Sequence, residues 1–284
     1  MGDFTDLLYH PARLALLGPP EWPLEAALRR RVSPTRAEAL ERWLVSGRSP
    51  AFLIESEPVG EAPSGWWPLS LQRGRPPALP LLASKLGGRP YLEGAADWPT
   101  GYRFLGQIDF GALPERLPHL PRRGLLSLFL GELSDFEPVR AHWYEAPHES
   151  KATPPPKDLR SAVRIESRLH FRPIWIPPET LDGRAHPSPE DEPELAEQVL
   201  AWTGQILLEQ GVRPGTHLLG PPLLTALTDQ FRPDELAHLA TVLRLESDPQ
   251  AGLSLGDRLL YILGARQDLE EGRLARCLPV WSSY

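Results

Sequence analysis

The chain of 284 residues is long enough for one large domain or two small ones, and its 41% hydrophobic and 24% charged residues are typical of a soluble globular protein. Its 34 prolines disfavour a fold of long helices, because proline interrupts the helical hydrogen-bond pattern. The net charge of -7 disfavours binding to nucleic acid, whose phosphates require clustered Lys and Arg, and favours a partner with a basic surface.

The single cysteine, Cys277, can form neither an internal disulfide nor a thiolate cluster for a structural metal. The N-terminus lacks the basic start and apolar stretch of a signal peptide. No run of about 18 apolar residues is present that would span a bilayer. We therefore expect a cytoplasmic protein with no membrane partner.

The first residues are predicted to form a separate N-terminal helical segment, 1–60. Ser33 is suited to cap a helix with Pro34 in its first turn, and apolar residues then recur every three or four positions up to Gly47. The run Arg29–Arg31 fits a helix C-terminus, where positive charge is favourable, better than it fits a nucleic-acid patch.

From residue 61 onward, strand-like segments alternate with turns rich in Pro and Gly. The continuous apolar run at 124–130 predicts a strand in the middle of a sheet. A helix is predicted at about 195–206, where apolar residues are spaced by three or four. The predicted strands, in chain order, are 104–110, 124–130, 139–144, 163–176, 241–247 and 258–263.

A nine-residue pattern occurs twice, at 84–92 and 216–224, with Leu, Gly, Pro and Leu at the same positions. Each copy is followed by two of the predicted strands in the same order. Three matching elements in one order predict an internal duplication, with halves of about 61–150 and 160–284. Since helices interrupt the strands, we expect an α+β fold of mixed, mainly antiparallel sheets from a duplicated core, preceded by the N-terminal helices.

The first half carries Ser84–Pro90 (Ser-Lys-Leu-Gly-Gly-Arg-Pro), Trp98-Pro99 and Phe104–Asp109 (Phe-Leu-Gly-Gln-Ile-Asp) in that order. On these motifs the chain resembles the YwqG-like family, a group of mostly bacterial proteins, over about residues 61–284. The resemblance implies an α+β fold with a duplicated core and supplies no activity. Genes of this family often lie near polymorphic toxin systems, in which a cytoplasmic protein neutralises a secreted toxin.

The second half departs from the family pattern at two places. Arg244 stands where the family usually has Gln, and Leu255 stands where it usually has the Trp of Trp-Gly-Asp. If those family residues line a shared site, this chain has altered it. A purely structural role for the turn is equally consistent with the change.

The sequence offers no recognisable catalytic motif. Cys277 lies in an apolar segment, which favours a buried, inert thiol over a nucleophile. His142, Glu145 and His148 form the best metal-ligand candidate, but Pro147 disfavours their presentation on one helix face. We therefore expect no catalytic residues, no metal and no cofactor.

Four carboxylates stand at strand ends of the two predicted halves: Asp109, Glu246, Asp248 and Asp257. Facing one another across a sheet, such groups could form an acid/base pair or a cation site. More often they cap turns and bind backbone NH groups. An enzyme or small-ligand module that uses these carboxylates at the repeat junction is the alternative function.

The lack of catalytic machinery, the negative charge and the resemblance together predict a non-enzymatic immunity protein. It is expected to bind and neutralise a cognate antibacterial toxin, of which a nuclease effector of a type VI or contact-dependent secretion system is one example. An acidic inhibitor is steered electrostatically to the basic surface of such a toxin. A scaffold that joins partners through its N-terminal helices is a further alternative. The carboxylates predicted to contact the toxin are Asp135, Glu137, Glu190, Asp191 and Glu192.

Overall fold

The computed structural model describes residues 49–59, 79–115, 117, 120–131, 139–155, 161–176, 217–220, 230–232, 235 and 238–283. Its strands are β1 (Ser49–Pro58), β2 (Lys85–Leu86), β3 (Tyr102–Asp109), β4 (Leu125–Gly131), β5 (Val139–Tyr144), β6 (Ser167–Ile176), β7 (His217–Gly220), β8 (Leu239–Leu245), β9 (Arg258–Ala265) and β10 (Leu278–Ser283). Its helical elements are η3 (Ala95–Asp97), η4 (Phe110–Ala112), η5 (Glu149–Lys151), α6 (Arg266–Glu270) and η7 (Leu274–Arg276).

Strands dominate the described residues, so the predicted α+β class is wrong and the fold is mainly β. In that part of the chain, the one α-helix with defined bounds is α6, which has five residues. The apolar runs that were expected to alternate with helices instead pair with one another as neighbouring strands. The helices predicted at 1–48 and 195–206 lie outside the described residues.

The end of the predicted N-terminal helical segment is also a correction, because residues 49–58 form the strand β1. The four residues from Ala51 to Ile54 are all buried, whereas Glu55 and Glu57 are exposed. A continuous buried run is typical of a strand that is covered on both faces. Prolines near both ends disfavour a helix over the same stretch.

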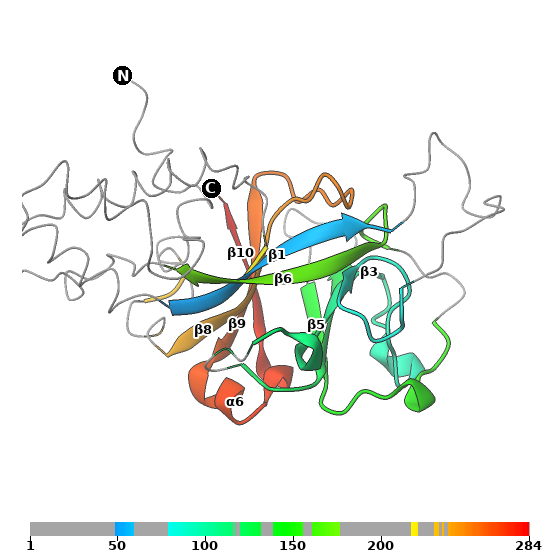
Figure 1. Cartoon of the computed structure of the whole chain (residues 1–284), viewed down its shortest axis with the longest axis horizontal. Coiled ribbons are helices and arrows are strands. Elements are labelled where there is room, and N and C mark those ends of the chain that lie inside the picture. The colour runs from blue at the N-terminus through cyan, green and yellow to red at the C-terminus, as the bar shows by residue number, and fades with distance from the viewer. Residues whose placement is uncertain are drawn as a thin grey trace, which may run out of the picture.

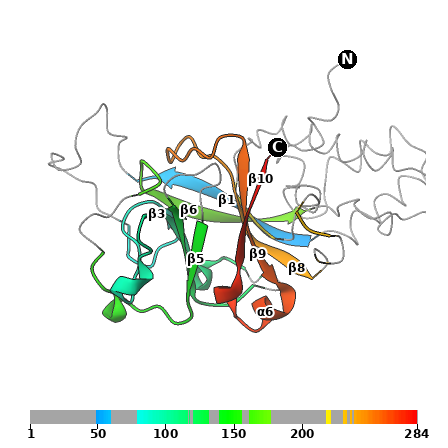
Figure 2. The same cartoon turned by 180° about the vertical axis from the view of Figure 1, so that it is seen from behind.

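The ten strands form one hydrogen-bonded sheet in the order β10-β9-β8-β7-β1-β6-β2-β3-β4-β5. Every neighbouring pair is antiparallel. The long strands β1 and β6 lie at the centre and pair from Ser49 opposite Ile176 to Pro58 opposite Ser167. They cross the middle of the molecule, with β8, β9 and β10 to one side and β3 and β5 to the other (Figures 1 and 2).

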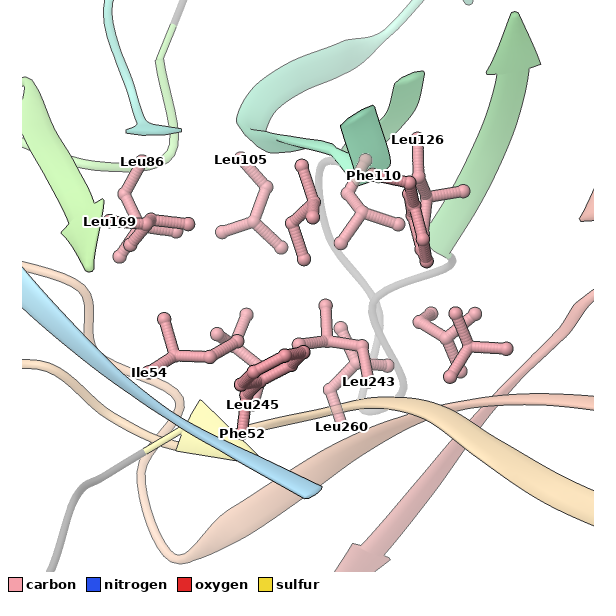
Figure 3. Close-up of a cluster of buried hydrophobic side chains, with 14 of the residues drawn as sticks. Phe52, Ile54, Leu86, Leu105, Phe110, Leu126, Leu169, Leu243, Leu245 and Leu260 are labelled. Atoms are coloured by element: carbon pink, nitrogen blue, oxygen red, sulfur yellow. The ribbon is translucent and has the colours of Figure 1, made fainter. Parts of the chain in front are cut away.

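The strand order is symmetric about the β1–β6 pair. On one side β1 is followed outward by β7 to β10, and on the other β6 is followed outward by β2 to β5. The β3–β4 and β8–β9 pairs each contain a register shift, at Phe104/Gly106 and at Thr241/Leu243. The sheet folds into two facing layers (Figure 3): the first layer is β6 with β2–β5, and the second layer is β1 with β7–β10. The layers cut across the predicted halves of about 61–150 and 160–284, because β6 lies in the second half of the chain but in the first layer, whereas β1 precedes both halves and lies in the second layer.

The main hydrophobic core lies between the two layers, whose inward side chains face each other (Figure 3). Burial of each large apolar side chain at this interface contributes about 1.5–3 kcal/mol. On one side lie Leu86, Leu105, Phe110, Leu126 and Leu169, and on the other Phe52, Ile54, Leu243, Leu245 and Leu260.

The outer face of β4, which points away from the main core, is also covered, and all seven residues of this strand are buried. Tyr91 packs on Leu125, and Leu92 packs with Phe129, so the segment after β2 folds back over the sheet. Burial on both faces explains why β4 is a continuous apolar run instead of an alternating one.

Candidate functional site

The Lys-Leu-Gly-Gly segment, which begins with β2, supplies the lysine of a buried ion pair with Glu166. Lys85 is fully buried on β2, where its Nζ donates to the Pro80 carbonyl oxygen at 3.2 Å and lies 3.6 Å from Glu166 Oε1. Burial lowers the pKa of Lys85, and the Glu166 carboxylate partly offsets that effect.

The second glycine of this segment, Gly88, makes room for the carboxylate. Gly87 and Gly88 have φ angles of 64° and 72°, in the left-handed region that favours glycine. A Cβ at Gly88 would lie 2.2 Å from Glu166 Oε1. The segment is therefore a tight turn closed over an ion pair.

Gln107 clamps the segment that covers the outer face of the first layer. Its Nε2 donates to the carbonyl oxygens of Leu81 at 2.7 Å and Ala83 at 3.0 Å, and its Oε1 accepts from the Tyr91 backbone NH at 3.1 Å. These three bonds fix residues 81–91 on β3. The glutamine of the Phe-Leu-Gly-Gln motif thus holds the fold together.

Arg244 takes the matching place in the second layer. Each residue follows the register shift of its strand pair, where Gln107 lies opposite Ser127 and Arg244 lies opposite Tyr261. Arg244 Nη2 is 2.5 Å from Glu246 Oε1, and both side chains are almost fully buried. The second layer therefore has a buried ion pair where the first layer has a neutral amide.

An acidic–aromatic cluster lies on the outer face of the first layer, and we define it as Tyr91, Glu93, Asp97, His142 and Tyr144. The Tyr91 and Tyr144 rings meet edge to face, with centroids 4.9 Å apart. Tyr91 Oη donates to Glu93 Oε1 at 2.7 Å, and Tyr144 Oη donates to Asp97 Oδ2 at 3.2 Å. His142 lies over the Tyr144 ring at 4.5 Å, with its Nε2 3.9 Å from Asp97 Oδ1.

Both phenols of the cluster stay protonated at neutral pH. Burial, together with the neighbouring Glu93, raises the pKa of Tyr91 to about 12, although the backbone NH of His148 acts in the opposite direction. Burial and the charge of Asp97 raise the pKa of Tyr144 as well. The tyrosines are therefore hydrogen-bond donors that hold the two carboxylates in place, and they are unsuited to act as general bases.

The cluster remains open to a partner at its charged groups. The side chains of Asp97, Glu93 and His142 are 18%, 35% and 40% exposed. Lys151 Nζ lies 3.9 Å from Glu93 Oε1 and neutralises part of the charge. Such an arrangement can receive a cationic side chain between the two carboxylates.

A buried hydroxyl lies on the same face of the sheet, at Ser127 on β4. It occupies the position directly opposite His142 on β5 and opposite Gln107 on β3. Its side chain is fully buried, and its Oγ has no hydrogen-bond partner among the described residues. A polar ligand group or a water would satisfy it.

Two of the four carboxylates predicted at the repeat junction, Asp109 and Asp248, cap the turns in which they lie. Asp109 accepts from the Gly111 backbone NH at 2.8 Å and caps η4, and burial raises its pKa. Glu246 belongs to the Arg244 pair. Asp248 accepts from Ser56 Oγ and from the backbone NH groups of Gln250 at 2.9 Å and Ala251 at 3.1 Å, whereas Asp257 is exposed. Local capping accounts for the backbone contacts of Asp109 and Asp248.

The two histidines considered as metal ligands have different roles. His142 belongs to the acidic–aromatic cluster, while His148 Nδ1 accepts from the Ser150 backbone NH at 3.2 Å and caps η5. In the described ranges, no group of three or more His, Cys, Asp or Glu is arranged to hold a metal ion. Burial and Asp268 raise the pKa of the Cys277 thiol to about 12, which makes it a poor nucleophile.

The five carboxylates predicted to contact a toxin, Asp135, Glu137, Glu190, Asp191 and Glu192, lie outside the described residues. Sequence reasoning missed the acidic–aromatic cluster. Its signal is the two-residue spacing of Tyr91 with Glu93 and of His142 with Tyr144, which places each pair on one face of an extended segment. Within the part of the chain that is described, no helix has the length and apolar character that a membrane span needs.

Comparison with curated proteins finds none that matches this chain. A family model, described as "Domain of unknown function (DUF1963)", matches residues 84–282. The matched region contains β2 to β9 and all of β10 but its last residue, and it leaves out β1. Because this match covers well over half of the sequence, the chain belongs to the DUF1963 family.

Proposed function

We propose that this chain is a cytoplasmic, non-enzymatic immunity protein that binds and neutralises a cognate antibacterial toxin with a basic surface. Within DUF1963, we place it in the YwqG-like group, a finer assignment that is compatible with the family match. A nuclease effector of a type VI or contact-dependent secretion system is the kind of toxin we expect.

The observation that carries the proposal is the acidic–aromatic cluster. A lysine or arginine of the toxin would place its charge between Glu93 and Asp97, beside His142. Tyr91 and Tyr144 are buried, so they hold the two carboxylates in place and the carboxylates make the contact. Arginine is a common anchor of protein interfaces.

The overall charge supports the same partner. At -7, the chain attracts a basic protein over a distance of about 10 Å at ordinary salt concentrations. The carboxylates proposed earlier, Asp135, Glu137 and Glu190–Glu192, would add to this attraction. Rim charges of this kind mainly increase the association rate.

The alternative, an enzyme or small-ligand module at the repeat junction, receives less support. It requires carboxylates that converge on one substrate, whereas Asp109 and Asp248 are engaged in capping backbone NH groups. The raised pKa values of the cluster tyrosines also disfavour proton abstraction there.

Co-expression with the product of the adjacent gene tests the function. The chain should form a stoichiometric complex with that protein and relieve its toxicity. A neighbouring product that is harmless, or that is toxic but neither bound nor neutralised, would sink the proposal.

A pair of variants tests the surface. Glu93→Gln removes one charge of the cluster, and Glu149→Gln removes an exposed charge on nearby η5. Glu93→Gln should slow association roughly three- to tenfold and weaken its salt dependence, with little change for Glu149→Gln. Equal effects of the two variants would exclude the cluster as the binding site while leaving the immunity function to stand on the co-expression result.

A further inference from the structure

The central strand β1 is bonded only to later parts of the chain among the described strands. It pairs with β6 along its whole length and with β7 from Phe52 opposite Leu219 to Ile54 opposite His217. Its successor β2 instead pairs with β3 and β6. Residues 59–84 therefore connect two strands that belong to opposite layers.

Side chains anchor β1 in the second layer. Phe52 and Ile54 are buried among Leu243, Leu245 and Leu260 (Figure 3). Ser56 Oγ donates to Asp248, which lies in the turn between β8 and β9. The slot between β6 and β7 thus recognises an extended segment by backbone hydrogen bonds on both edges and by two apolar side chains two residues apart.

We infer that this slot also accepts β1 from a second copy of the chain, giving a strand-exchanged dimer. Each copy would place its β1 between β6 and β7 of the other, with the same register and the same buried side chains. Every strand contact of the monomer is then retained. Exchange of an identical element between two copies is a low-cost route to such dimers.

The folding order favours competition between the two arrangements. The meanders β2–β5 and β7–β10 are built mostly from strands that follow one another, whereas the contact between Glu57 and His170 spans 113 positions. Such long-range pairing forms slowly, because the loop must close first. The β1 of another chain can therefore compete when the chain concentration approaches the effective concentration of the tethered strand, about 1 mM or less.

Cysteine pairing across β1 and β6 provides the test in the full chain. Glu57 and Arg168 lie opposite each other and are both exposed. In a Cys277→Ser background, one chain carries Glu57→Cys and another carries Arg168→Cys. The two are unfolded, mixed, refolded together at several concentrations and oxidised mildly.

The co-refolded mixture should contain a disulfide-linked dimer of the two variants. The fraction of chains in this dimer should rise roughly tenfold for each tenfold rise in chain concentration, while the dimer remains the minor species. Mixing the variants after separate refolding should give none. A chain carrying both substitutions should close its disulfide within the monomer at low concentration. Replacing Arg168→Cys by Arg140→Cys, on the edge strand β5, should abolish the dimer.

Three results would overturn the inference. One is the absence of the linked dimer at high concentration although the doubly substituted monomer closes. Another is equal cross-linking by chains that were folded before mixing, or by the Arg140→Cys control, since both would indicate contact between folded surfaces. Failure of the doubly substituted chain to close would show that β1 and β6 do not pair as described.

Discussion

The turn that closes over the buried Lys85–Glu166 pair makes a quantitative prediction for Gly88→Ala. A left-handed φ costs an alanine about 1–2 kcal/mol. Its Cβ would also meet the Glu166 carboxylate at 2.2 Å and displace it from Lys85. Leaving the buried ammonium without its counterion adds about 2–3 kcal/mol, because Glu166 is itself mostly buried. We expect a loss of about 3–5 kcal/mol in the free energy of unfolding, measured by urea denaturation.

Gly101→Ala is a matched control for this prediction. Gly101 has a similar φ of 78°, but no atom lies within 4 Å of its added Cβ, so the variant should lose only about 1–2 kcal/mol. In a Glu166→Ala background, the cost of Gly88→Ala should fall to the same value. If Gly88→Ala and Gly101→Ala are equally destabilising, or if Gly88→Ala costs as much without Glu166 as with it, then Gly88 is not required to make room for the carboxylate.

Three further predictions concern the core, the cluster and the second ion pair. Phe52→Ala should lower the free energy of unfolding by about 3–5 kcal/mol in urea denaturation, and a loss below about 1 kcal/mol would contradict the central place of β1. Because the pKa of Tyr91 is about 12 in the folded state and near 10 when unfolded, its contribution to stability is present below pH 10 and declines as pH rises from 10 to 12. The free energy of unfolding of the wild type, relative to that of Tyr91→Phe, should therefore fall as pH rises from 10 to 12. A difference between the two proteins that is independent of pH in that window would refute the burial of the phenol. Arg244→Gln should be more destabilising than Arg244→Gln with Glu246→Gln in thermal unfolding, since the single change leaves a buried carboxylate without its arginine; the reverse order would show that the pair contributes nothing.

The strands of the first layer could be predicted closely from the sequence. The apolar run predicted at 124–130 is β4, and the segment predicted at 139–144 is β5. Both carry a local signal, because burial on one or two faces fixes the pattern of apolar residues. The strand at 278–283 and the strand β1 were missed, since prolines at Pro50, Pro58 and Pro279 obscure their periodicity.

The placement of β1 beside β6 and β7 could not be predicted from any local pattern. Phe52 and Ile54 indicate one buried face, but no feature of that segment specifies which sheet it joins. The same limit applies to the candidate site. Tyr91 and Tyr144 are separated by more than fifty positions, and only the pairing of β3, β4 and β5 beneath residues 81–91 brings their rings together.

Within one chain, β1 and β6 each complete a layer built by a distant part of the sequence, which makes the two layers one cooperative unit. The inner edge of the β7–β10 meander is covered by β1, and the inner edge of the β2–β5 meander is covered by β6. Neither meander therefore covers both of its own edges. The family match begins at residue 84 and leaves out β1, although β1 fills the slot between β6 and β7 and contributes Phe52 and Ile54 to the core. In this chain, the matched residues therefore form a sheet whose centre depends on a strand outside the matched region.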